Sequence, residues 1–209
     1  MSFPDRYAIL LDGEWLKKTI QHRAKGQFPS HTDILNEVSA LQAHGDLAGL
    51  AIYRVFYYTA DPLTCRATNP ISKVETNFAS TSQHSQNLSL INMLENQPDF
   101  AVRRGQLVLQ GWMIRPMAIQ ALSAGTKSTV TGADLKPNIS QKGVDMMIGL
   151  DMASLAIKRL VSTVVVVSGD SDLVPAMKLA RTEGLRVYLA TLGEQVRPEL
   201  KIHADRILS

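Results

Sequence analysis

The sequence predicts an α/β fold in which a mostly parallel sheet is covered by helices on both faces. Short apolar runs rich in β-branched residues, such as residues 163–167, alternate with stretches of helical spacing, such as residues 144–160. This alternation is typical of crossover units, which join parallel strands through helices. The 209 residues are 45% hydrophobic and 20% charged, which suffices for one well-filled core. We therefore expect residues 1–209 to form a single domain.

The first 59 residues contain two strand patterns separated by two helical patterns. An apolar run that ends in an acid and a glycine predicts a buried strand and a turn, and the residues after it have helical spacing. A second helix is expected to be capped by Thr32 and to end at Gly45. Its apolar face would carry Ile34, Leu35, Val38 and Leu41. The expected elements are a strand at 7–13, a helix at 14–24, the capped helix, and an aromatic strand at 50–59.

The middle of the chain has weaker patterns. Residues 61–85 are rich in Thr, Ser, Asn and Pro, and we expect a long surface loop there, a candidate lid. A helix should follow at about 86–96, and the alternation at 100–112 fits a strand or a bent hairpin. Residues 113–141 are expected to be irregular and basic.

Regular patterns return in the last third of the chain. Gly184 is expected to end the helix predicted at 173–182, since glycine favours the positive φ of a helix end. The expected elements are helix 144–160, strand 163–167, helix 173–182, strand 185–190, a helical turn at 199–203 and a short strand at 206–208.

Composition excludes several classes of protein. The single cysteine, Cys65, rules out an internal disulfide and a cysteine-based zinc site. We recognise no signal peptide at the N-terminus and no apolar run near the roughly 20 residues that a membrane helix needs, so we expect a cytoplasmic protein without membrane contact. The net charge is +3. Between residues 101 and 142, Asp134 is the sole acid against six basic residues, which indicates a solvated loop or a phosphate-facing surface: Arg103, Arg104, Arg115, Lys127, Lys136 and Lys142.

Aspartates follow the ends of two predicted strands. Asp12 comes directly after the first apolar run, and Asp170 and Asp172 follow the run at 163–167. Because ligands bind outside the carboxyl ends of parallel strands, we expect these acids at one edge of the sheet. With about 100° per residue in a helix, Asp145 falls on the packing side of its helix and Asp151 on the opposite, water-facing side.

Clustered carboxylates are the ligands that Mg²⁺ and Mn²⁺ prefer, and such ions can activate water against a phosphodiester. Each acid also has a structural interpretation. Asp12 could form a turn before Gly13, and Asp172 could cap the next helix. Asp145 lies in the first turn of its helix, where a negative charge interacts favourably with the helix dipole. The histidines lack ligand spacing, and there is neither a Gly-rich phosphate loop with a lysine nor a nucleophile elbow.

Several motifs together resemble the NYN domain, in the LabA-like branch of the PIN-like nuclease superfamily. They are Asp12-Gly13 after a strand, Arg103-Arg104-Gly105, the KGVD motif at 142–145 and the SGDSD motif at 168–172. The resemblance is strong over residues 142–192, good at 7–13 and weak across 60–100. It implies a Rossmann-like three-layer α/β/α sandwich and cleavage of RNA with Mg²⁺ or Mn²⁺.

The resemblance also implies roles for individual residues. Asp12, Asp145 and Asp170 would bind the metal, Asp172 would be a fourth ligand or would orient water, and Ser168 would support that water or a phosphate oxygen. Lys142, together with Arg103 and Arg104, would contact substrate. The family commonly has an asparagine where this chain has Trp15, which could stack on a base or pack in the core.

Three functions are compatible with these patterns. The first is a metal-dependent endoribonuclease acting on single-stranded or locally unpaired RNA. The second is a nucleic-acid-binding regulator or scaffold of the LabA-like type that is weakly active or inactive. The third is a haloacid-dehalogenase-type phosphatase, whose pattern the residues after Asp12 do not continue. The sequence leaves the oligomeric state open, a homo-oligomer included.

Overall fold

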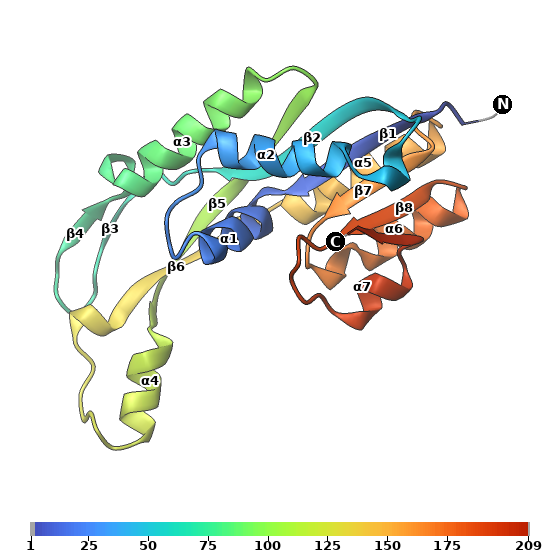
Figure 1. Ribbon diagram of the computed structural model, residues 1–209. Helices are drawn as coiled ribbons and strands as arrows, with labels where there is room; N and C mark the ends of the chain where they lie inside the picture. Colours follow the sequence, from blue (N-terminus) through green and yellow to red (C-terminus); the bar gives the residue numbers. More distant parts are fainter. Residues whose placement is uncertain (1–2, 209) are drawn as a thin grey trace. The chain divides into compact units, whose positions relative to one another are not determined.

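The computed structural model describes residues 3–208 (Figure 1). Contacts within the chain divide it into two compact units, and each is described by itself. Unit 1 consists of residues 1–59, 90–105 and 143–209, and unit 2 of residues 60–89 and 106–142. The single domain over residues 1–209 stays a prediction.

A seven-stranded sheet has the order β6-β5-β2-β1-β7-β8-β9. In unit 1, β1 is parallel to both β2 and β7, and β7, β8 and β9 continue the parallel arrangement. Strand β5 begins in unit 1 and ends in unit 2, where it pairs with β6 in the antiparallel sense. The mostly parallel α/β sheet is thus confirmed. The strands are β1 (Arg6–Asp12), β2 (Ala51–Asp61), β5 (Phe100–Ile114), β6 (Leu135–Lys142), β7 (Thr163–Val167), β8 (Arg186–Ala190) and β9 (Arg206–Leu208).

Helices cover both faces of the sheet of unit 1 (Figure 1). Side chains of a strand alternate between the faces, so in β1 Ala8 and Leu10 join one core while Ile9 and Leu11 join the other. Buried residues of α5 (Val144–Ile157), α6 (Val174–Thr182) and α7 (Pro198–Ile202) belong to the first core. Those of α1 (Gly13–Arg23), α2 (His31–Gln42) and α3 (Ser82–Glu95) belong to the second. This is the expected three-layer α/β/α arrangement.

The chain reverses its direction of travel across the sheet between two central strands. From β1 the chain crosses to β2 on one side, whereas from β7 it crosses to β8 and β9 on the other. Loops at the carboxyl ends of β1 and β7 therefore diverge, and such a switch point leaves the crevice in which open α/β sheets bind ligands. Leu11 pairs with Val167, so the residues that follow them, Asp12 and Ser168, start this crevice together.

Unit 2 has more structure than its sequence suggests. Instead of a long loop at 61–85, it contains an antiparallel pair, β3 (Arg66–Thr68) and β4 (Glu75–Asn77), a 3₁₀ turn at Phe78–Ser80 and the start of α3. The buried Asn69 builds the connection, since its side chain accepts from the amides of Ile71 and Ser72 at 3.0 and 3.1 Å and donates to the carbonyl of Gly132 at 3.0 Å.

Residues 113–141 are also more regular than expected. They contain the end of β5, a helix α4 (Pro116–Ser123), a 3₁₀ turn at Gly132–Asp134 and most of β6. Pro116 occupies the first turn of α4, where the backbone N–H that proline lacks would have no partner within the helix. The expectation of an irregular segment was wrong because α4 and β6 have only eight residues each, too few to give a clear periodic pattern.

The remaining elements lie close to their predicted bounds, with corrections at both ends of α2, which ends at Gln42 with Ala43, not Gly45, as its C-cap. Ser30, not Thr32, is the N-cap, and it forms a capping box with Asp33. Another finding concerns membranes: among residues 3–208, no helix is both long and apolar enough to cross one.

Candidate active site

Asp12 is a buried acid at the carboxyl end of β1, with 8% of its surface exposed. It is the N-cap of α1, because its Oδ1 accepts from the backbone amide of Trp15 at 3.1 Å. Its Oδ2 accepts from the hydroxyl of Ser168 at 2.9 Å. Gly13 follows it because a Cβ there would lie 2.5 Å from the carbonyl oxygen of Tyr58 and 2.6 Å from the ring of Tyr57. Close packing, rather than a flexible turn, therefore explains this glycine.

The segment after β7 folds back on itself through its own side chains. The hydroxyl of the fully buried Ser168 accepts from the amide of Asp170 at 3.0 Å, and Oδ1 of Asp170 accepts from the amide of Asp172 at 3.0 Å. Asp170 is therefore the N-cap of the 3₁₀ turn at Ser171–Leu173, the role that the sequence suggested for Asp172. Helix α6 follows this turn directly.

Four carboxylates from three segments form one electrostatic cluster. Burial raises the pKa of Asp12, and the charges of Asp145 and Asp170 raise it further, while the Trp15 amide and the Ser168 hydroxyl oppose the rise. Partial desolvation, followed by the charges of Asp170 and Asp172, raises the pKa of Asp145. These charges act on one another because the residues lie at the same mouth of the sheet.

Within the described part of the chain, no cation forms an ion pair with these carboxylates. Across residues 3–208, none of the four acids has a Lys, Arg or His nitrogen within 4.0 Å. In the same part of the chain, no three His, Cys, Asp or Glu side chains lie close enough to hold a metal ion as they stand. The donors are hard oxygens that suit Mg²⁺ or Mn²⁺. Among the described residues, the four acids therefore lie near one another without an ion-pair partner, but no three of them are close enough to bind one metal ion together.

Trp15 packs over the loop that carries two of the acids. A Cβ on Gly169 would lie 2.3 Å from the indole Nε1, so the ring rests against the backbone of that glycine. The indole is half-buried and also contacts the core beneath α1. Of the two roles that the sequence left open, packing describes its position here, at the rim of the candidate site.

The two acids of α5 differ from their helical-wheel assignments. Asp145 is exposed, because Val144 and Ile148 carry the packing face in the first turns. Asp151 was expected to face water, but it is half-buried. Its Oδ2 accepts from the hydroxyl of Tyr58 at 3.0 Å and from Nε of Arg103 at 2.9 Å. Both expectations failed because they treated α5 as an isolated helix.

The basic residues proposed to contact substrate lie in different surroundings. Arg103 pairs with Asp151 and lies over the ring of Phe56, 5.2 Å from its centre. Arg104 pairs with Glu95, with 3.0 Å between Nε and Oε1. Lys142 is exposed at the end of β6 in unit 2. In this conformation both arginines already neutralise acids, so phosphate would have to compete for them.

Sequence reasoning missed a cation beside the acidic segment. Nη1 of Arg197 donates to the hydroxyl of Ser171 at 3.1 Å. Arg197 lies in the connection after β8, just before α7. The signal that could have found it is its position, because that connection starts at the same edge of the parallel sheet as the segments after β1 and β7.

Comparisons with known proteins identify the family and the fold. The family model described as "NYN domain" matches residues 101–209. The chain is 41% identical over 69 residues to "Uncharacterized protein y4oD" of Sinorhizobium fredii, a match that covers 31% of this chain and 32% of that protein. The chain thus spans about a third of the length of that relative. A crystal structure of VPA0982 from Vibrio parahaemolyticus, described as a protein of unknown function, is similar in fold, with a TM-score of 0.53 and 15% identity over 100% of this chain and 94% of the other.

Proposed function

Because this chain belongs to the NYN domain family, a family of PIN-like nucleases, we propose that it is a metal-dependent endoribonuclease. The observation that supports this most is the cluster of Asp12, Asp145, Asp170 and Asp172, whose charges act on one another without a cationic partner among residues 3–208. Keeping like charges together costs stability unless a positive group joins them. Sites that perform chemistry are where such arrangements concentrate.

In this proposal Asp12, Asp145 and Asp170 hold a Mg²⁺ or Mn²⁺ ion, which when bound would polarise the phosphodiester and activate water for its hydrolysis. Ser168 keeps the carboxylate of Asp12 in place through the hydrogen bond to its Oδ2. Both carboxylate oxygens of Asp12 retain a free lone pair after accepting one hydrogen bond each. Asp172, exposed at the mouth, is free to orient water or to serve as a fourth ligand.

The charge of unit 2 favours RNA as the partner. Of the 22 Lys and Arg and the 19 Asp and Glu of the chain, unit 2 holds six and three, which leaves sixteen of each in unit 1. Within the described residues of unit 2, four of the six basic side chains have no ion pair: Lys73, Arg115, Lys136 and Lys142. Basic groups without counter-ions bind nucleic-acid phosphates by releasing cations from them. Single-stranded or unpaired RNA is the expected form, since an open strand can expose its backbone to a crevice.

Cleavage of RNA tests the proposal directly. Wild-type protein should cut an end-labelled single-stranded RNA in the presence of Mn²⁺ and should stop when EDTA is added. Asp170→Asn should lower the cleavage rate on the order of 100-fold or more. Mutation of residues that only hydrogen-bond to metal ligands already lowers activity about 10- to 100-fold in other enzymes. Glu183→Gln, at an exposed acid after α6, is the matched control and should keep the wild-type rate. A panel of RNAs left intact would reject nuclease activity, and equal cleavage rates for the two variants would reject the role of Asp170 in it.

A second candidate is a nucleic-acid-binding regulator without turnover. Two observations favour it: the acids are not closed around a common point among the described residues, and Trp15 occupies the rim where the family commonly has asparagine. This candidate predicts RNA binding that weakens with salt, with a slope of about −0.7 per neutralised phosphate. Replacing Lys136 and Lys142 by alanine should then flatten the slope, and no cleavage should accompany binding at any Mn²⁺ concentration.

A further inference from the structure

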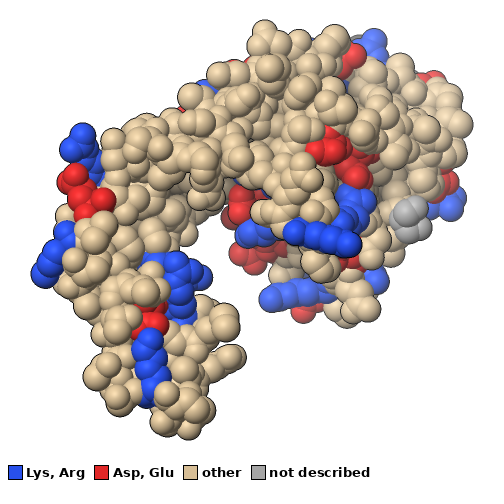
Figure 2. Space-filling view, turned by 60° about the vertical axis from the view of Figure 1, so that its left-hand side comes forward, with Lys and Arg blue, Asp and Glu red and all other residues tan. Residues whose placement is uncertain are grey.

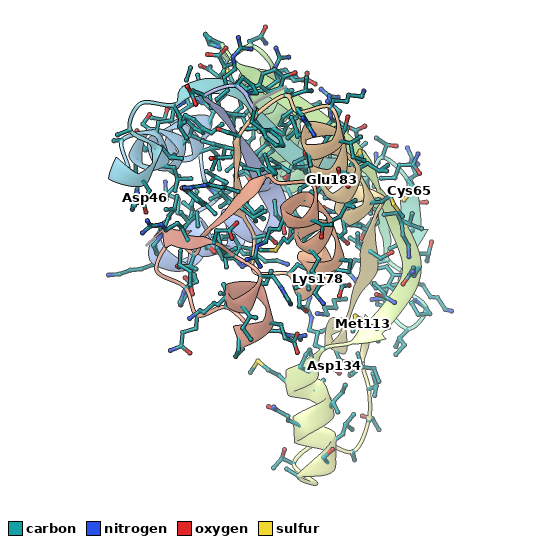
Figure 3. All side chains as sticks on the ribbon, turned by 90° about the vertical axis from the view of Figure 1, so that its right-hand side faces the viewer. Asp46, Cys65, Met113, Asp134, Lys178 and Glu183 are labelled. Carbon is teal, nitrogen blue, oxygen red and sulfur yellow. The ribbon has the colours of Figure 1, made fainter. Side chains whose placement is uncertain are left out.

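Unit 1 contains a second concave region, away from the aspartates. It is an open cavity of about 780 Å³. It lies where the end of α6 meets the starts of β8 and β9, and Lys178 on α6 is labelled in Figure 3. The charged and aromatic side chains of its lining are Lys178, Arg181, Arg186, Arg206, Asp205 and Tyr188.

The lining has four cations and a single acid, and the acid is fully engaged. Oδ1 of Asp205 accepts from Nε of Arg181 at 3.0 Å, and its Oδ2 accepts from the amide of Val187 at 2.8 Å. Asp205 therefore fixes the guanidinium of Arg181 in place. Arg206 lies 3.9 Å from Asp46, at the limit of an ion pair. Lys178 and Arg186 have no ion pair anywhere in residues 3–208.

The four cations of the cavity cannot all be explained by a favourable interaction with the end of a helix. Lys178 and Arg181 lie in the last turns of α6, where cations complement the helix dipole. Arg186 and Arg206, however, are the first residues of two strands, β8 and β9. Three elements thus contribute cations to one cavity, where Asp205 is paired with Arg181 and, of the four cations, Asp46 reaches only Arg206, at 3.9 Å.

The cavity is separate from the candidate active site. Strands β1, β7, β8 and β9 are parallel, so the first residues of β8 and β9 lie at the amino edge of the sheet, whereas the aspartates follow the carboxyl ends of β1 and β7. The five residues of β8 alone span about 16 Å at roughly 3.3 Å per residue. One phosphodiester cannot occupy both places.

We infer that this cavity is an anion-binding site for a small molecule that carries two or more phosphate groups. Its volume lies within the range of about 300–1,000 Å³ that is usual for small-molecule sites. Guanidinium groups match the oxygens of phosphate in a bidentate way, and Arg181 is already oriented by Asp205. A ligand with two or more charges would supply the counter-ions that Lys178 and Arg186 lack.

Calorimetric titration with pyrophosphate and with ATP, in EDTA and without divalent cations, tests this inference. Wild-type protein should bind both, and the double variant Lys178→Ala, Arg186→Ala should bind at least tenfold more weakly. The matched control is Lys158→Ala with Arg54→Ala, which removes the same charges from exposed positions outside the cavity and should bind as wild type does. Asp170→Asn should also bind normally, so that loss of nuclease activity and loss of this site are distinguishable.

Two results would overturn the inference. The first is absence of pyrophosphate and ATP binding in wild-type protein, or equal weakening by the cavity and control variants. The second is an effect of the cavity variant on single-stranded RNA alone, which would assign these cations to an RNA path. Both removed side chains are exposed, and thermal unfolding of the variant should confirm that it folds.

Discussion

At the scale of single residues, Ser168 connects the ends of the two central strands, β1 and β7, through hydrogen bonds. Its hydroxyl donates to Asp12 after β1 and accepts from the amide of Asp170 after β7, and no part of the residue is exposed. A buried hydroxyl that both donates and accepts a hydrogen bond stabilises the two segments it joins. Removing it would leave a carboxylate oxygen and an amide without hydrogen-bond partners. The position of Asp12 therefore depends on a residue that does not itself carry charge.

Ser168→Ala should lower the free energy of unfolding by about 1–3 kcal/mol, because a buried acceptor and a donor lose their partner. Urea denaturation measures this. Ser162→Ala is the matched control, as its hydroxyl donates to the carbonyl of Arg6 at 3.1 Å at the surface, and it should cost less than about 0.5 kcal/mol. Equal costs for the two variants would show that Ser168 has no special structural role.

Asp12 should make stability depend on pH. Burial, with Asp145 and Asp170 adding to it, raises its pKa in the folded protein above the unfolded value of about 3.9. Below that value the carboxyl is protonated in both states and contributes nothing. As the pH rises through the folded pKa, ionisation costs more in the folded state than in the unfolded one, so this group lowers stability at neutral pH.

Asp12→Asn should therefore melt at a higher temperature than wild type at pH 7, and the difference should shrink as the pH falls toward 4. The amide oxygen can still accept from Trp15, and the Ser168 hydroxyl can accept from the amide nitrogen. Thermal unfolding between pH 4 and 8 without divalent cations measures the difference. A difference that is constant with pH, or that grows toward low pH, would contradict the assignment.

At the scale of elements, the start of α2 shows how a side chain defines a helix end. Ser30 accepts from the amide of Asp33 at 3.3 Å, and the carboxylate of Asp33 accepts from the Ser30 amide at 2.7 Å. The sequence pattern suggested Thr32, two residues later, as the cap. Ser30 is the N-cap because Asp33, three residues later, completes a capping box with it.

Ser30→Ala should destabilise the protein by about 1 kcal/mol, the usual loss for an N-cap. Thr32→Ala, inside the first turn and exposed, should change stability by less than about 0.5 kcal/mol and can even favour the helix. Guanidinium denaturation of the two variants compares them. A larger cost at Thr32 would restore the cap that the sequence suggested.

Elements with strong periodicity were predictable and those held by distant contacts were not. Strand β7 occupies the predicted residues 163–167, because a run of β-branched residues buried on both faces leaves little choice of structure. The turn around Asn69 depends on a hydrogen bond to Gly132, 63 positions away, which no local pattern reveals. The exposure of Asp145 and the partners of Asp151 were missed for the same reason.

At the scale of the whole molecule, the charges are divided between the units. Unit 1 has as many acids as basic residues, and the net charge of +3 belongs to unit 2. On the face drawn in Figure 2, most of the surface belongs to uncharged residues, and several of the basic side chains lie next to acidic ones. RNA binding should for this reason depend on particular unpaired lysines and arginines, and should not follow from a uniformly positive surface.

The parallel sheet explains why much of the candidate site was predictable. Once strands alternate with helices, aspartates that follow different strands must meet at one edge, however far apart they lie in sequence. Asp12 and Asp170 are 158 positions apart and still act on one another. The binding of Mg²⁺ or Mn²⁺ and the cytoplasmic location stay predictions, and the oligomeric state stays open.

Binding of Mn²⁺ measures most directly whether these aspartates form a metal site. In a titration followed by electron paramagnetic resonance, wild-type protein should deplete the signal of free Mn²⁺. Asp12→Asn, Asp145→Asn and Asp170→Asn should each weaken that binding by at least tenfold, while Glu183→Gln should leave it unchanged. Wild-type protein that leaves the Mn²⁺ signal unaltered, or three aspartate variants that bind as tightly as wild type, would contradict the shared metal site.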